Sequence, residues 1–174
     1  MKQRVLKMTS MGLFLLVAAA ACGPRARFEG WTVRKQATSY RVGMLSGDWK
    51  RIKGVDGDAA FINSSTNAVI LANASCEDFR DAPLEYLTKH LLIGYTEREI
   101  LSREKVMLDN REALITILTA KLDGVKVKMA LCVVKKNYCI YDLSYAAPPG
   151  VFDAALEEFD RYVKGFEVLS GKDK

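Results

Sequence analysis

Three short turn sequences, regularly spaced, divide the second half of the chain into four segments of β-strand composition. Asp109-Asn110, Asp123-Gly124 and Lys135-Lys136-Asn137 separate residues 104–108, 111–122, 125–134 and 138–145. Asp, Asn and Gly tolerate the positive backbone φ angles that tight hairpin turns require. Strands joined by such short loops run antiparallel. This part of the sequence therefore predicts a four-stranded antiparallel meander.

Further strands are expected before the meander. Short β-like segments bounded by turn residues occupy residues 31–34, 40–45, 49–52, 59–63 and 68–73. The last two are joined by Ser64-Ser-Thr-Asn67 and predict a hairpin.

Two segments have the apolar spacing of amphipathic helices. The first is expected to begin at the capping residue Asp81, with Pro83 in its first turn, and to end at Gly94. The apolar positions are Leu84, Leu87 and Leu91 in this helix and Phe152, Leu156, Phe159, Val163 and Phe166 in the C-terminal one. The predicted fold class is α+β, an antiparallel sheet of N-terminal strands and meander covered by helices.

The composition is that of a globular protein without a strong net charge. The chain has 174 residues, 49% of them hydrophobic and 27% charged, and a formal net charge of +5. Residues 1–21 contain three Lys or Arg and no Asp or Glu, so the remaining 153 residues carry only +2. Binding to phosphate backbones needs concentrated Lys and Arg. Nucleic acid is therefore not expected as a partner.

The N-terminus has the features of an export signal. Residues 1–10 are basic, residues 11–21 are apolar and uncharged, and Cys22 follows. An apolar helix of eleven residues reaches about 16 Å, too short for a hydrocarbon core of about 30 Å. Residues 1–21 are therefore interpreted as a signal peptide.

Ala19-Ala20-Ala21 followed by Cys22 resemble the lipobox of bacterial lipoproteins, in which the signal is cut before a cysteine that receives lipid. Ala19 stands where that motif usually has leucine. The resemblance predicts that Cys22 carries acyl chains such as palmitate; the alternative is a plain secretory signal with a free Cys22. Gly23 in place of aspartate favours the outer membrane, facing the periplasm. Residues 22–30 would form a tether between the lipid and the domain.

The pairing of the last two meander strands decides which cysteines can bond. We expect Val133 to pair with Cys139 across a three-residue loop, which places Cys132 and Cys139 on opposite faces. A two-residue loop would reverse this conclusion. In an oxidising compartment, Cys76 is then the expected partner of Cys139, with Cys132 reduced. Three free buried thiols are the alternative.

Sequence motifs for catalysis or metal binding are lacking. His90 is the only histidine, and no nucleophile is directed toward it, so a structural or solvent-exposed role is expected. The cysteines lack the paired spacing of a zinc site, and there is no phosphate-binding loop, nucleophile elbow or zinc-protease motif. We therefore expect a protein that is not an enzyme and needs no metal or cofactor.

Aromatic residues are the remaining candidates for a site. They are Trp31, Tyr40, Trp49, Tyr141, Tyr145 and Phe152. We expect them to form part of the core. If they instead lined a pocket, its occupant would be apolar.

The element order and several short segments resemble the PsbP-like superfamily, and within it small lipoproteins of the DcrB and LpqN kind. The segments are the early Trp-containing strands, His90-Leu-Leu-Ile-Gly94, Leu108-Asp-Asn-Arg-Glu-Ala113, Tyr141-Asp-Leu143 and the final Phe-marked helix. The resemblance implies a single α/β/α sandwich domain over residues 31–168, followed by a disordered tail at 169–174. It also implies an accessory, assembly or binding role.

Two functions are compatible with these features. The first is a non-catalytic, membrane-anchored envelope lipoprotein whose domain docks on another envelope protein. The second is the binding or sensing of an apolar ligand, such as a lipid, between sheet and helix. A solid core with an exposed apolar patch would favour the first, and a large closed apolar cavity the second.

Lipidation of Cys22 is directly testable. Mass spectrometry of protein extracted from membranes should find a diacylglyceryl group on an N-terminus at residue 22, and Cys22→Ala should release the protein into the soluble fraction. Unchanged membrane attachment of Cys22→Ala, or a mature N-terminus elsewhere, would contradict the anchor.

Overall fold

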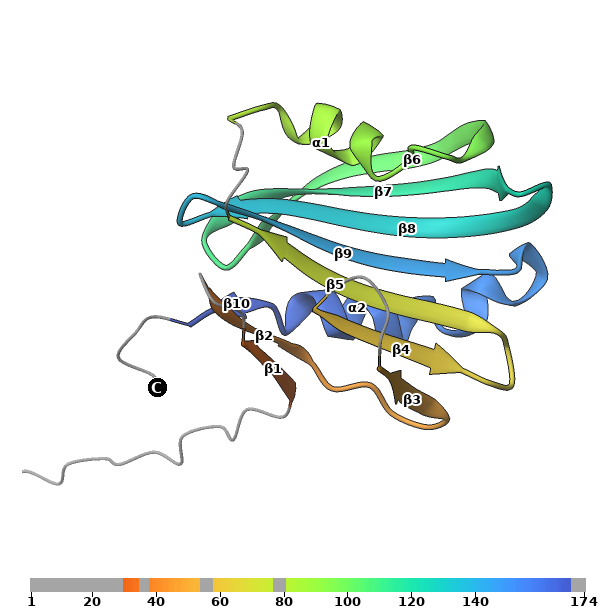
Figure 1. Ribbon diagram of the computed structural model, residues 1–174, viewed down its shortest axis with the longest axis horizontal. Coiled ribbons are helices and arrows are strands. Elements are labelled where there is room, and N and C mark those ends of the chain that lie inside the picture. Colours follow the sequence, from red (N-terminus) through yellow and green to blue (C-terminus); the bar gives the residue numbers. More distant parts are fainter. Residues whose placement is uncertain (1–29, 35–37, 54–57, 77–80, 170–174) are drawn as a thin grey trace, which may run out of the picture.

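The computed structural model describes residues 30–34, 38–53, 58–76 and 81–169. The predicted signal peptide, Cys22, the tether up to residue 29 and the tail from residue 170 lie outside this part of the chain. Within it, a long antiparallel sheet dominates the structure (Figure 1).

Seven strands form this main sheet, in the order β3-β4-β5-β9-β8-β7-β6. They are β3 (Trp49–Ile52), β4 (Ala59–Asn63), β5 (Ala68–Ser75), β6 (Thr96–Leu108), β7 (Arg111–Leu122), β8 (Val125–Lys136) and β9 (Cys139–Ala147). The meander predicted from the turn sequences is confirmed as β6 to β9. Its first strand begins earlier than expected, because β6 is an outer strand whose charged, mostly exposed residues give no alternating apolar pattern.

A small sheet and the helices cover the two faces of the main sheet. The small sheet has the order β1-β2-β10 and consists of β1 (Gly30–Arg34), β2 (Ser39–Gly43) and β10 (Glu167–Val168). It lies on the same face as the 3-10 helix η1 (Pro149–Ala154) and α2 (Leu156–Lys164), which we call the α2 face. The helix α1 (Leu84–His90) covers the other, the α1 face. The predicted α+β class with helices over the sheet is confirmed.

The main core lies between the main sheet and the elements of the α2 face. Alternate positions of β5 carry Ala68, Ile70, Ala72 and Ala74, all fully buried. Their small size leaves room for large rings, and the largest fully buried side chains include Tyr40, Tyr141, Tyr145, Tyr162, Phe61 and Phe152. The α1 face holds two smaller apolar clusters, which pack against Leu84, Leu87 and Leu92.

Two glycines allow α2 to end directly against the small sheet. A Cβ atom on Gly43 of β2 would collide with the carbonyl group of Arg161 in α2. A Cβ atom on Gly165, just after the helix, would collide with the backbone of Gly43. The close approach of these two segments therefore requires the absence of a side chain at both positions.

Helix α1 begins later than expected, and Asp81 is not its cap. The helix starts at Leu84 after Pro83, without a side-chain cap. The Asp81 carboxylate instead accepts a hydrogen bond from Lys135 Nζ at 2.8 Å. The prediction of an Asp81 cap is therefore wrong, because a strand lysine lies within reach of that carboxylate.

The pairing of β8 with β9 also differs from the prediction. Lys136 pairs with Cys139 and Val134 with Tyr141, so the loop contains only Asn137 and Tyr138, at φ angles of 51° and 60°. This two-residue loop places Cys132 and Cys139 on the same face, the reverse of the expected arrangement. Both faces of β8 are covered and apolar, so alternation does not identify the core row, and tyrosine is an unusual residue at positive φ.

The structure contains a disulfide between Cys76 and Cys139, and Cys132 is a free, buried cysteine. The pairing is the expected one, but the reasoning from opposite faces is wrong. Ser75 pairs with Ile140, which brings the next residue, Cys76, opposite Cys139. Cys132 pairs with Leu143, well along the strand from Cys139. Burial raises the pKa of the Cys132 thiol to about 12, which keeps it protonated.

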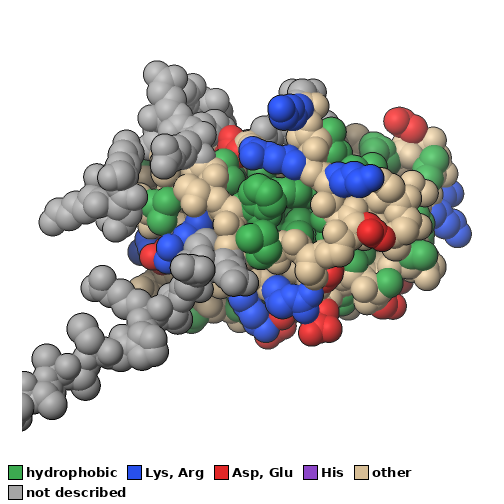
Figure 2. Space-filling model, turned by 90° about the horizontal axis from the view of Figure 1, so that it is seen from below, with side chains coloured by type: hydrophobic (Ala, Val, Ile, Leu, Met, Phe, Trp, Pro, Cys, Tyr) green, Lys and Arg blue, Asp and Glu red, His purple; other side chains and the backbone are tan. Residues whose placement is uncertain are grey.

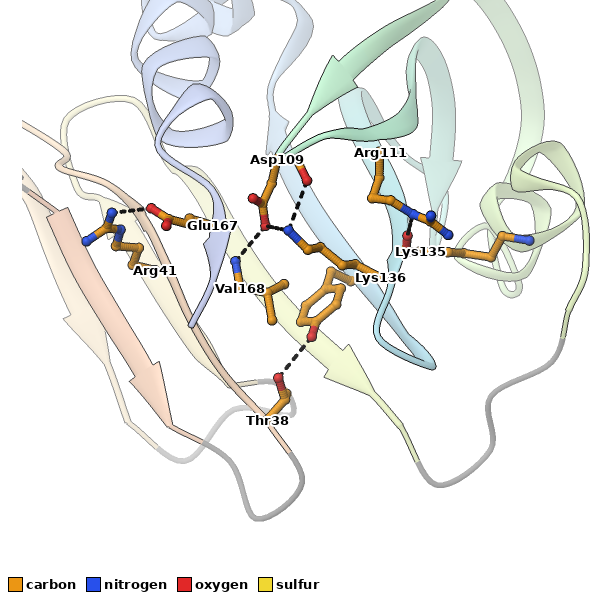
Figure 3. A network of polar contacts seen from close by, with 9 residues as sticks. Thr38, Arg41, Asp109, Arg111, Lys135, Lys136, Glu167 and Val168 are labelled. Carbon is orange, nitrogen blue, oxygen red and sulfur yellow. Dashed lines mark hydrogen bonds and ion pairs between the residues drawn. The ribbon is translucent and has the colours of Figure 1, made fainter. Parts of the chain in front are cut away.

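A polar network fastens the small sheet to the ends of the meander hairpins (Figure 3). The Asp109 carboxylate accepts hydrogen bonds from the backbone N–H of Val168, at 2.8 Å, and from Lys136 Nζ, at 2.6 Å. Lys136 also donates to the Asp109 carbonyl at 3.0 Å. Nearby, Thr38 shares a hydrogen bond with the Tyr141 hydroxyl at 2.9 Å. These contacts join β10 to the β6–β7 turn and to β8.

Removing the disulfide tests this part of the fold. Cys76→Ala and Cys139→Ala should each lower the free energy of unfolding by about 2–5 kcal/mol, and the double variant should cost little more than either. Cys132→Ala should cost less, because it changes only packing. Denaturant unfolding measures these values, and a Cys132–Cys139 peptide in a non-reducing digest would contradict the observed pairing.

Candidate functional site

The six aromatic residues predicted as core or pocket lie at different depths. Tyr40, Tyr141, Tyr145 and Phe152 are fully buried in the main core, against which Trp49 packs part-buried. Trp31 is 37% exposed, and its ring lies 5.5 Å from that of Phe61. These rings fill the space between the layers, and the Tyr145 hydroxyl donates a hydrogen bond to the carbonyl of Phe152 at 2.7 Å. Their positions favour the interpretation as core.

Figure 2 shows the molecule from below, where a group of hydrophobic side chains near the centre of the face is bordered by lysines and arginines. His90 is exposed in α1, and its ring lies 4.6 Å from that of Tyr86. In the described ranges, three or more His, Cys, Asp or Glu side chains are nowhere grouped to hold a metal ion.

An apolar groove runs along α2, because the main sheet extends beyond the helix on this face. Its floor is formed by Ile115 and Ile117 of β7 and Ala130 of β8, and one wall by Leu156, Phe159 and Val163. Four acidic residues border it: Glu104, Asp153, Glu157 and Asp160. The volume is about 460 Å³. We call this depression the α2 groove.

Ion pairs at the border of the α2 groove are open to solvent. Asp153 contacts Lys128 at 3.0 Å with a side chain that is 78% exposed, and Glu157 contacts Arg161 at 3.2 Å with one that is 87% exposed. Exposed pairs of this kind contribute about 1 kcal/mol or less. These carboxylates can therefore exchange their partners for basic groups of another molecule at little cost.

A second depression lies on the α1 face, beside the helix. It is lined by Leu71, Ala72, Asn73, Leu91, Tyr95, Met129, Leu131, Asp142 and Ser144. The volume is about 290 Å³. Helix α1 packs mainly on β7 and β8, so the neighbouring part of β5 and β9 is left uncovered here. We call this depression the α1 pocket.

Asp142 is the unusual residue of the α1 pocket. Burial raises the pKa of its carboxyl group from 3.8 to about 7. Loss of water is the cause of this rise; neither a cation nor a hydrogen-bond donor from the described residues stabilises the charged form. Asn73, directly opposite on β5, is its polar neighbour. A largely desolvated carboxyl group without a counter-charge among the described residues is costly to the fold, which makes Asp142, a part-buried residue, a candidate for function.

The charge of Asp142 by itself predicts a position on the outer side of the sheet. The side chain does point away from the main core, but the opposite face is covered as well. The signal that could have revealed this is the apolar row Met129, Leu131 and Val133 on β8, which lies on the same face and needs a cover of its own.

The fold is the PsbP-like fold, as comparison with solved structures shows. The chain is similar to cyanobacterial PsbP (CyanoP) from Synechocystis sp., with a TM-score of 0.59, 12% identity, and coverage of 87% of this chain and 99% of that one. LpqN of Mycobacterium tuberculosis, a protein involved in cell envelope biogenesis, gives a TM-score of 0.57 at 9% identity, with coverage of 82% and 91%.

A Bacteroides thetaiotaomicron structure gives a TM-score of 0.55 at 14% identity and covers 84% of this chain and 50% of that one. The sequence matches no protein-family model and no curated protein. Across the described residues, the helices are too short or too polar to cross a membrane.

Substitution of Asp142 tests the burial of its charge. With the pKa raised from 3.8 to about 7, the folded protein holds a proton that the unfolded chain releases, so stability falls as pH rises from about 4 to about 7, by at most about 4 kcal/mol. Asp142→Asn should remove this dependence. Urea unfolding should find the variant more stable than the wild type near pH 8 and similar to it near pH 4; parallel pH profiles would contradict the assignment.

Proposed function

We propose that the protein is a non-catalytic envelope lipoprotein, anchored through Cys22 in the outer membrane and facing the periplasm, whose domain docks on another envelope protein. The lipobox-like N-terminus supports the anchor. The PsbP-like fold, shared with an LpqN that takes part in cell envelope biogenesis, supports the location and the accessory role.

The observation that carries the docking role is the α2 groove. Its floor consists of Ile115 and Ile117, which α2 leaves only partly covered. The main core beneath is filled by aromatic rings. A solid core with accessible apolar surface is typical of a protein-binding domain, whereas a carrier of a large apolar molecule needs a cavity.

Charge indicates what kind of partner fits the α2 groove. Carboxylates stand on both sides of the apolar floor, from Glu104 on β6 to Asp160 on α2. A segment that presents a row of apolar side chains flanked by Lys or Arg matches both the floor and the border. The proposed partner is therefore an envelope protein with a basic, amphipathic segment.

Two synthetic peptides of the same length test this specificity. One peptide has Leu at the positions of one helix face and Lys at the positions that flank it. The other has Glu at every Lys position. The Leu/Lys peptide should bind and shift the NMR signals of groove residues, and the Leu/Glu peptide should not. Glu157→Lys should weaken binding several-fold, as should Ile117→Asp, whereas Ile93→Asp, at an isoleucine 75% exposed and outside the groove, should not.

The same surface can be examined in native membranes. A photo-reactive residue at position 157, at the border of the α2 groove, should give a discrete crosslinked product that disappears when Ile117→Asp is added. The matched control is position 89, which is exposed on α1 across the molecule. Equal crosslinking from both positions, or equal binding of the two peptides, would overturn the docking proposal.

A further inference from the structure

The α1 pocket combines apolar walls with a polar strip on its floor. The walls come from separate elements: Leu71 from β5, Met129 and Leu131 from β8, and Leu91 from the end of α1. Tyr95 adds an aromatic side chain. A small apolar group can therefore be surrounded on several sides.

The polar strip is fixed by the strand pairing. Asp142 and Ser144 are two residues apart on β9, so their side chains share the α1 face. On β5, Asn73 pairs with Asp142 and Leu71 with Ser144. Three polar side chains thus lie together in the sheet, within otherwise apolar surroundings, and no loop movement is needed to assemble them.

Two lysines on the described α1 face are engaged elsewhere. Lys135 binds Asp81 at 2.8 Å and the carbonyl of Ala82 at 2.9 Å. Lys105 contacts Glu112 at 3.0 Å and Glu85 at 3.9 Å. Neither contributes to the stabilisation of the Asp142 carboxylate. A cation from outside would therefore not have to displace either lysine from Asp142.

We propose that the α1 pocket binds a small apolar molecule carrying a protonated amine, with the ammonium group on Asp142 and the apolar part among Leu71, Leu91, Met129 and Leu131. The ammonium group supplies the counter-charge that the part-buried carboxylate lacks, and Asn73 and Ser144 provide further oxygen acceptors. The ring of Tyr95 adds a surface that favours cations. An acid of similar size is disfavoured because it would place a second negative charge beside Asp142.

This site is independent of the proposed docking role. The α2 groove lies on the opposite face of the main sheet, and its lining residues are different. A ligand in the α1 pocket therefore leaves the α2 groove free.

Three six-carbon probes of matched size test the proposal: n-hexylamine, hexan-1-ol and hexanoate. The full chain with Cys22→Ala is titrated with each near pH 8, where Asp142 is ionised and the amine protonated, and binding is followed by NMR. Hexylamine should bind saturably at the signals of the α1 pocket, at least about tenfold more tightly than hexanol, and hexanoate should not bind.

Variants link the effect to the carboxylate. Asp142→Asn should weaken hexylamine binding by at least about tenfold and leave hexanol binding unchanged. Asp153→Asn, at an exposed carboxylate on the other face, is the matched control and should have no effect. Hexylamine should also lower the pKa of the Asp142 carboxyl group followed by NMR. Absence of saturable binding, equal binding of amine and alcohol, or full binding by Asp142→Asn would each overturn the proposal.

Discussion

The pairing of Lys136 with Cys139 across a two-residue turn determines the rest of the structure. It directs Ala130, Cys132 and Val134 into the main core, where they meet the rings carried by β9. By the same geometry it sends Asp142 to the α1 face. A shift of one residue would exchange the two rows, turning Met129, Leu131 and Val133 toward the main core and Ala130, Cys132 and Val134 toward the α1 face. The disulfide and the aromatic core both rest on this register.

Short helices over a wide sheet explain why the surface is open in two places. Helix α1 has seven residues and α2 has nine, whereas the main sheet has seven strands. Each helix covers the strands on which it packs and leaves the neighbouring apolar surface accessible. The α2 groove and the α1 pocket have this common origin, but they differ in charge: exposed carboxylates border the first, and one part-buried carboxyl group lies in the second.

The elements of the fold were predictable because turn and helix signals are local. Asp109-Asn110 and Asp123-Gly124 occur at the turns where the sequence indicates them, with positive φ angles. The β8–β9 register was not predictable. Tyrosine is an unusual turn residue, so Tyr138 gives no sign that it belongs to the turn, and both faces of β8 are apolar. The strand β10 was missed since two residues carry no periodic pattern. The candidate sites are formed by segments that are distant in the sequence; Leu91 and Asp142, for example, line the same pocket. No local sequence motif therefore reveals them.

The contact of Gly43 with Gly165 has a consequence for comparing distant sequences. The three solved structures of similar fold share only 9–14% sequence identity with the chain, so few identical residues are available to guide a sequence alignment. Both glycines are required by the spacing between the last helix and the second strand. A chain of this fold with larger residues there must hold that helix further from the small sheet. In this chain, glycine at both positions therefore marks the place where the last helix and the second strand are in backbone contact.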